Sequence, residues 1–143
     1  MTKKEILQRW YDEVWCKGNL DMIDELFCPD TIASGIIPEM QMGPQDFRDL
    51  IFAVRNLVGD ISVALPVTIE QDDWLSAVLI VNTCRNDSGT PIIVTGQVIA
   101  RFDDGRMVET YNQFDWMSLF EQLGQFPPET LPVCMAGQRL DWV

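Results

Sequence analysis

Histidine is absent from this sequence of 143 residues. Without an imidazole, a Ser-His-Asp or Cys-His catalytic group, an HExxH zinc site and a mixed Cys/His zinc site are all excluded. The four cysteines lie far apart and form no C-x-x-C pair, so we expect buried thiols rather than a cysteine-only metal site. The phosphate-binding loops G-x-G-x-x-G and G-x-x-x-x-G-K-S/T are missing as well. We therefore expect no metal and no cofactor, and any chemistry must use carboxylates, carboxamides, hydroxyls or indoles.

Basic residues and long apolar runs are also scarce. Ten Lys and Arg against 22 Asp and Glu give a net charge of −12, which repels nucleic-acid backbones and anionic membrane surfaces. No apolar run approaches the roughly 18 residues of a membrane-spanning helix, and the first residues lack the apolar stretch of a signal peptide. The sequence thus predicts a cytoplasmic protein with no nucleic-acid and no membrane partner. Its length and its 47% apolar content are typical of one domain with one core.

The first half of the chain has helical periodicity. Apolar residues recur at helical spacing over residues 6–17, 20–27 and 44–58. Gly18 and Gly59 follow the first and third of these segments, and glycine is a common helix stop. The pattern predicts three helices.

The second half alternates apolar and polar residues with a period of two, which predicts strands. The turn signals Asp72-Asp73, Asn86 to Gly89 and Asp104-Gly105 separate them. The expected strands are residues 61–70, 74–85, 91–102 and 107–115, followed by a short helix over 116–123. Helices before an antiparallel sheet predict an α+β fold, in which a curved sheet wraps over the three helices and leaves a cone-shaped cavity. We expect this domain to span residues 1–124.

Residues 125–143 form a tail that is too apolar to be free in solvent. Its prolines are expected to keep it extended, packed on the same domain or on a dimer partner. A homodimer is expected because the strand over residues 74–85 is apolar on both faces, more than one helix layer can cover.

Three motifs resemble those of a known family. They are L-x-x-W-Y-x-E-V-W-x-x-G-N-L-D-x-I-D-E-L-F-x-P-D at residues 7–30, G-P-x-x-F-R at 43–48 and F-x-D-G-R-M-V-E-x-Y-N-x-F-D-W at 102–116. Together they resemble the SnoaL-like polyketide cyclase family of the nuclear transport factor 2-like superfamily. The resemblance implies a cone-shaped α+β barrel, usually dimeric through its sheet, with a deep apolar pocket for an apolar small-molecule ligand.

The same resemblance implies an intramolecular aldol closure without a cofactor, in which an aspartate near the end of the last long strand acts as acid and base. Where the family often has E-H-W-D, this chain has E-T-Y-N at residues 109–112, so Thr110 replaces the histidine and Asn112 the aspartate. Ser34 stands where the family has a second histidine. The next carboxylate is Asp115.

Three polar residues are candidates for catalysis. Asp115, between Phe114 and Trp116, is either an acid/base group or the cap of the helix that follows it. Asn112 and Gln97 lie on strands that a hairpin makes neighbours, so their carboxamides either hold a carbonyl or enolate oxygen or lie on a solvated sheet face. The resemblance also implies that Gln97 lies near the reacting group.

The expected substrate-binding residues are apolar or aromatic. Tyr11 and Trp15 are one helical turn apart and share a face, which either lines the cavity or packs in the core. Phe47, Ile99 and Phe114 complete this set. Three functions remain open: an enzyme that catalyses aldol-type cyclisation or isomerisation of an apolar carbonyl or polyketide-like compound, a non-catalytic ligand-binding protein of the same fold, and an epoxide hydrolase, suggested by the R-x-D spacing at residues 101–103.

Overall fold

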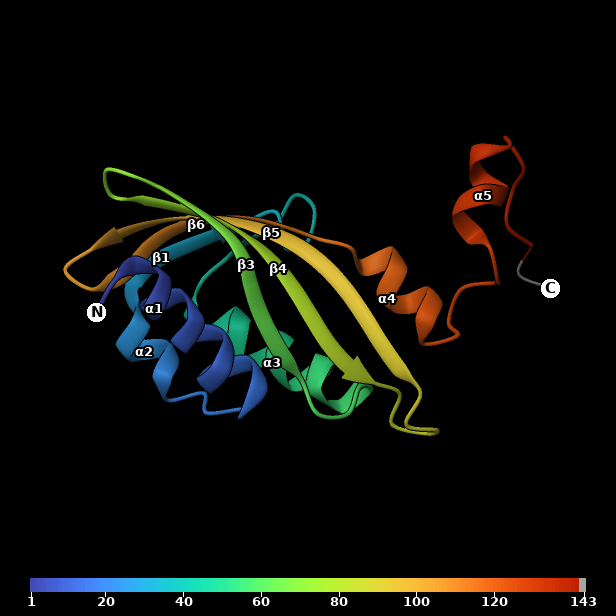
Figure 1. The fold of residues 1–143 in the computed structure, drawn as a ribbon, viewed down its shortest axis with the longest axis horizontal. Helices are drawn as coiled ribbons and strands as arrows, with labels where there is room; N and C mark the ends of the chain where they lie inside the picture. Colours follow the sequence, from blue (N-terminus) through green and yellow to red (C-terminus); the bar gives the residue numbers. More distant parts are fainter. Residues whose placement is uncertain (142–143) are drawn as a thin grey trace.

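A six-stranded sheet curves over a layer of helices in the computed structural model, which describes residues 1–141 (Figure 1). The strand order is β2-β1-β6-β5-β4-β3, and the sheet is not closed into a barrel. Four long antiparallel strands make up most of it: β3 (Ser62–Gln71), β4 (Trp74–Cys84), β5 (Pro91–Asp103) and β6 (Arg106–Phe114). The α+β class and the curved sheet expected from the sequence are confirmed.

The helices of the first half cover one face of this sheet (Figure 1). They are α1 (Lys3–Arg9), which continues as the π-helix η1 (Trp10–Cys16), α2 (Met22–Leu26) and α3 (Pro44–Leu57). In α3, proline occupies the tolerated first position and the Asp46 carboxylate accepts a hydrogen bond from the Gly43 N–H at 2.9 Å. The buried Phe47 and the exposed Phe52 lie on opposite sides of this helix, as expected of an amphipathic helix.

The edge of the sheet differs from the sequence-based expectation. Phe27–Ser34 forms strand β1, parallel to β6, and Gln41–Met42 forms the short strand β2. The sequence predicted a longer second helix ending at Pro29. The pairing of β1 with β6 is interrupted between Phe27 and Ile32, and proline is tolerated in such an irregular segment. Thr31 fixes the segment, because its hydroxyl donates to the Met107 carbonyl at 2.8 Å.

The tail also differs from the expectation. After α4 (Trp116–Gln122), the chain forms a further helix, α5 (Thr130–Met135), where the sequence predicted extended structure. Pro132 is compatible with this helix because it lies in the first turn, where a backbone N–H has no helical partner. Figure 1 shows α5 standing apart from the sheet, on the side away from α1–α3. Residues 142 and 143, the end of the expected tail, lie outside the described residues.

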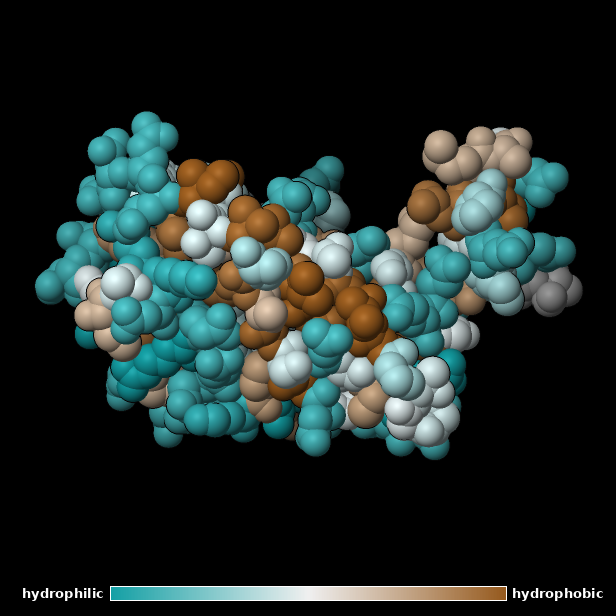
Figure 2. Space-filling model, viewed as in Figure 1, coloured by the Kyte–Doolittle hydropathy of each residue, from teal (hydrophilic) through white to brown (hydrophobic). Residues whose placement is uncertain are grey.

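The two faces of the sheet differ in burial. Along β5 the side chains alternate: Ile92, Val94 and Val98 are buried against the helices, whereas Ile93 and Ile99 are exposed on the opposite face. We call this opposite face the outer face. Figure 2 shows a band of hydrophobic side chains along the strands. No helix within residues 1–141 is both long and apolar enough to cross a membrane.

Candidate functional site

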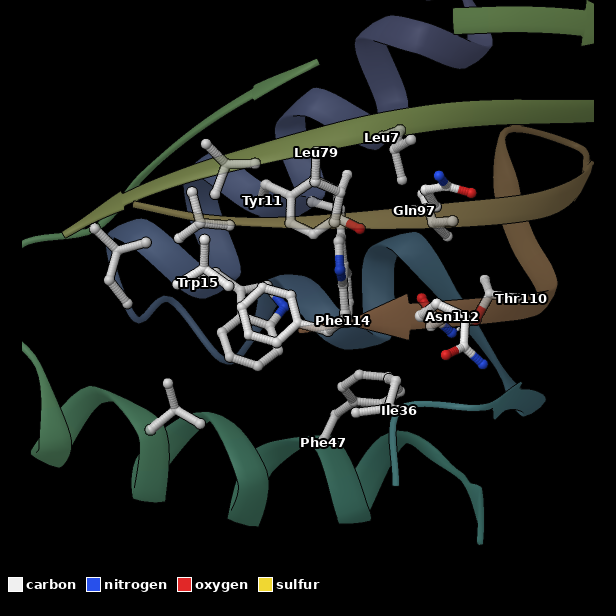
Figure 3. Close-up of a pocket in the computed structure, with 18 of the residues that line it drawn as sticks. Leu7, Tyr11, Trp15, Ile36, Phe47, Leu79, Gln97, Thr110, Asn112 and Phe114 are labelled. Carbon is white, nitrogen blue, oxygen red and sulfur yellow. Dashed lines mark hydrogen bonds between the residues drawn. The ribbon is translucent and has the colours of Figure 1, made fainter. Parts of the chain in front are cut away.

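A cavity of about 90 Å³ lies between the inner face of the sheet and the helices (Figure 3). Its wall is mostly aliphatic and aromatic, and it includes three of the five tryptophans: Trp10, Trp15 and Trp116. The volume is below the roughly 300–1,000 Å³ of typical ligand sites. A ligand of several rings therefore requires some of these aromatic side chains to move.

The π-helix η1 directs three aromatic side chains to this cavity. The Lys17 N–H donates to the Asp12 carbonyl, five residues earlier, at 3.1 Å. An α-helix turns about 100° per residue, so the side chains at positions 10, 11 and 15 would spread over roughly 140° of its circumference. A π-helix turns about 80° per residue, and the same three side chains spread over only roughly 80°. The wider turn thus allows Trp10, Tyr11 and Trp15 to line one cavity together.

Tyr11 contributes a phenol hydroxyl to the cavity wall. The residue is buried, and Figure 3 shows its hydroxyl pointing into the cavity. Among the hydrogen bonds of residues 1–141, none involves this hydroxyl. Every fully buried side-chain polar atom in that range has a partner, so the unpaired Tyr11 hydroxyl is not fully buried. It is therefore open to the cavity that Tyr11 lines. Burial raises the pKa of Tyr11 above the usual range of a phenol. Tyr11 is therefore a neutral hydrogen-bond donor at physiological pH.

Asn112 contributes a hydrogen-bond acceptor. Its Nδ2 donates to the Ser34 carbonyl at 3.1 Å and to the Thr110 hydroxyl at 3.0 Å. Because the Ser34 carbonyl can only accept, this contact fixes the orientation of the amide. Oδ1 is then the atom of Asn112 that is left to accept a hydrogen bond. Gly35 permits this contact, since it has a φ of +86° and a Cβ at this position would collide with the Asn112 carbonyl.

Aromatic rings pack against one another in the cavity wall. Phe47 packs edge-on against Trp10 and Phe27, with ring centroids 5.4 and 5.3 Å away. Phe114 contacts Trp116 edge-on at 4.6 Å, and the Trp116 indole N–H donates to the Ile36 carbonyl at 2.7 Å. Phe47 and Phe114 thus line the cavity, as do Tyr11 and Trp15.

Asp115 lies outside the cavity. It is exposed, and its carboxylate accepts a hydrogen bond from the Ser118 N–H at 3.0 Å, which caps α4. Of the two roles that the sequence allowed, the structure shows the cap. The strand ends one residue earlier, so the side chain of Asp115 follows the helix instead of the inner face of β6.

Two other sequence-based candidates are exposed residues of β5. Gln97 borders the cavity, but it alternates with the buried Gly96 and Val98, and its side chain is exposed. Ile99 is 45% exposed on the outer face and does not line the cavity. The prediction that Ile99 lines the cavity is wrong. Arg101 also lies away from the cavity, where it pairs with Glu109 at 2.6 Å, so its R-x-D spacing does not form an epoxide-hydrolase site there.

Within residues 1–141 no carboxylate lines the cavity, and its polar side chains are hydroxyls, carboxamides and indoles. Thr110 and Trp116 belong to the site but were not predicted for it. The period of two along β6 could have indicated Thr110, because it shares a face with Asn112. The η1 geometry has no signal in the side-chain pattern.

The fold and the cavity define the class: an α+β protein with a curved sheet that encloses a mainly apolar, uncharged pocket. The sequence profile of the SnoaL-like polyketide cyclase family matches residues 5–123, so this chain belongs to that family. No curated protein matches the chain.

Solved structures have the same fold. A candidate polyketide cyclase from Bacillus cereus is 20% identical, with a TM-score of 0.76 over 89% of this chain and 87% of that one. IdmH from Streptomyces antibioticus, described as a candidate polyketide cyclase, is 18% identical, with a TM-score of 0.75 over 87% and 99%. A protein of ketosteroid isomerase-like fold from Catenulispora acidiphila is 16% identical, with a TM-score of 0.71 over 86% and 95%.

Proposed function

We propose that this protein binds an apolar carbonyl compound in its cavity and promotes enolate chemistry, either aldol-type ring closure or isomerisation, through a hydrogen bond from Tyr11. The observation that carries the proposal is the hydroxyl of the buried Tyr11, which points into the cavity and finds no partner among residues 1–141 (Figure 3). A neutral phenol in an apolar wall stabilises the negative charge that develops on a carbonyl oxygen during enolisation.

The proposal assigns no protein base to the reaction. In an aldol closure the enol carbon bonds to a second carbonyl carbon, one proton leaves the attacking carbon, and one proton arrives on the second carbonyl oxygen. With no carboxylate on the cavity wall within residues 1–141, water must accept the first proton and supply the second. This requirement favours substrates whose acidic carbon lies between two carbonyl groups, as in polyketide-like compounds. Asn112 Oδ1 can accept a hydrogen bond from an enol or hydroxyl group of the same ligand.

A second candidate is a binding protein without catalysis. Two observations favour it: no charged side chain lines the cavity within residues 1–141, and Asp115 caps α4 instead of facing the cavity. General acid–base catalysis by a positioned side chain typically contributes about 10²–10⁴-fold in rate. A cavity without such an acid or base can still bind the ligand, but it lacks this contribution to the reaction rate.

The experiment uses 2-indanone, a small enolisable ketone, as the probe. Three tryptophans line the cavity, so binding should change the tryptophan emission. Loss of one neutral hydrogen bond in the Tyr11→Phe variant should weaken binding by roughly 2- to 12-fold, equivalent to about 0.5–1.5 kcal/mol. Tyr111→Phe is the matched control, because Tyr111 lies on the outer face and donates to Glu109 at 2.8 Å.

Exchange of the indanone α-protons with D₂O, followed by NMR, separates the two candidates. Exchange that is faster than in buffer and falls in Tyr11→Phe supports the enzyme. Saturable binding without faster exchange supports the binding protein. Equal affinities of the wild type and Tyr11→Phe would refute the role given to the Tyr11 hydroxyl.

The proposal includes a homodimer in the cytoplasm, as expected from the sequence. The outer face supports the dimer, since Ile69, Ile93 and Ile99 are 67%, 57% and 45% exposed there. Several large apolar side chains exposed on one face are typical of protein–protein contacts.

A further inference from the structure

The C-terminal arm, residues 125–141, lies beyond the family match, which ends at residue 123. Its base is fixed in two places. The Phe126 ring packs edge-on against Phe120 of α4 with ring centroids 6.2 Å apart, and the Thr130 hydroxyl donates to the Pro127 carbonyl at 2.6 Å. The arm therefore leaves the domain in a defined direction, toward the side of the sheet that faces away from α1–α3 (Figure 1).

The helix of the arm exposes large apolar side chains. Leu131 is 55% exposed and Met135 is 80% exposed. They are four residues apart on α5 and so lie on the same side of the helix. Figure 2 shows the arm standing off from the rest of the molecule across an open notch, with hydrophilic side chains between its base and the band of hydrophobic side chains on the strands. The chain's own core does not cover this side of α5.

We propose that the arm clasps a second copy of this chain. Two copies pair through their outer faces, and the Leu131–Met135 side of each α5 packs against the partner. The inference rests on the dimer proposed above and is independent of the ligand chemistry. In such a twofold contact the same patch meets itself, and an arm on the outer-face side of one copy comes to lie beside the other.

The charge distribution limits where a second copy can pack. With a net charge of −12, the chain repels nucleic acid, anionic membranes and copies of itself, except where a surface carries no net charge. The middle of the outer face meets this condition, because its exposed β5 residues Ile93, Thr95, Gln97 and Ile99 carry no charge. The charged side chains lie toward one end, where Arg101 pairs with Glu109 at 2.6 Å and the carboxylates of Asp30 and Asp103 lie in the same surface depression. Two acidic copies can therefore meet there.

Analytical ultracentrifugation of the full-length chain tests the proposal with three variants. In Leu131→Asp/Met135→Asp, four charges enter the dimer contact, and the dissociation constant of the dimer should rise about tenfold or more. Ile99→Asp tests the sheet contact and should also dissociate the dimer. Phe52→Asp is the matched control: Phe52 is 68% exposed on α3, on the other side of the molecule, and its replacement should leave the dimer intact.

Two outcomes would overturn the proposal. If Ile99→Asp dissociates the dimer and the double arm variant does not, the sheet contact stands and the clasp is wrong. If the wild type is a monomer at tens of micromolar, both are wrong, whereas the indanone measurements on Tyr11→Phe still decide the function. Alkylation of the exposed Cys134 gives a second readout. Its rate should fall with increasing wild-type concentration and remain constant in the double arm variant.

Discussion

Replacement of Phe47 by alanine should destabilise the fold far more than replacement of Phe52, although both phenylalanines belong to α3. Phe47 is 3% exposed and packs against Trp10 and Phe27, whereas Phe52 is 68% exposed. A buried Phe→Ala change typically costs about 3–5 kcal/mol. We expect the upper part of that range, because the new void joins the existing cavity and the wall cannot collapse onto it. Phe52→Ala should stay within about 0.5 kcal/mol of the wild type.

Urea denaturation and thermal melting measure this difference. For 143 residues the unfolding entropy is about 0.3 kcal/mol/K, so a loss of about 4–5 kcal/mol in Phe47→Ala should lower Tm by roughly 13–17 °C. A larger cavity should also admit a larger ketone than 2-indanone. If the two variants differed by less than about 1 kcal/mol, Phe47 would not be a core residue and the position of the cavity between α3 and the sheet would be wrong.

Three further predictions concern single side chains. Burial raises the pKa of Tyr11 and the hydrogen bond to Glu109 raises that of Tyr111, so the native protein should show little phenolate absorbance near pH 10. Because both folded-state pKa values exceed the unfolded value, the stability they confer is complete below about pH 10 and is lost above it; phenolate absorbance without unfolding at pH 10 would contradict this. Asp115→Ala should cost about 1 kcal/mol in stability and Asp115→Asn little, with unchanged indanone affinity in both, since Asn caps nearly as well; a weakened affinity would return Asp115 to the site. Asn112→Asp should cost roughly 2–4 kcal/mol at pH 8 and less at pH 4, because only the protonated acid can donate to the Ser34 carbonyl; urea midpoints that do not depend on pH would refute this geometry.

The long strands could be predicted from the sequence because each has a period of two and ends at a turn signal. Strand β1 could not, because residues 20–27 have helical spacing and the pairing of β1 with β6 joins residues almost eighty positions apart. Such non-local contacts leave no trace in a local pattern. The helix α5 was missed because prolines indicate extended structure unless their place in the first turn of a helix is known.

The site was predictable to a more limited extent. The apolar stripe of the first helix correctly placed Tyr11 and Trp15 on one side, but side-chain spacing does not reveal a π-helix. On β5, Gln97 and Ile99 are two positions apart and share a face, yet both faces of the strand are apolar, with Val98 on one and Ile99 on the other. Period alone then leaves open which set faces the core. Asp115 fitted two roles, and only its position after the strand end separates them.

The departures from the family pattern form one hydrogen-bonded group in the structure. Asn112, Thr110 and Ser34 stand where the resemblance implies an aspartate and two histidines, and the Asn112 amide joins all three positions by donating to the other two. A carboxylate at position 112 would face the Ser34 carbonyl, and with threonine and serine at the histidine positions no cation would balance it. Asparagine satisfies the same contacts without charge. The three replacements are therefore mutually consistent. They leave the described part of the cavity wall without a charged side chain, so that the Tyr11 hydroxyl meets a carbonyl oxygen as a neutral donor.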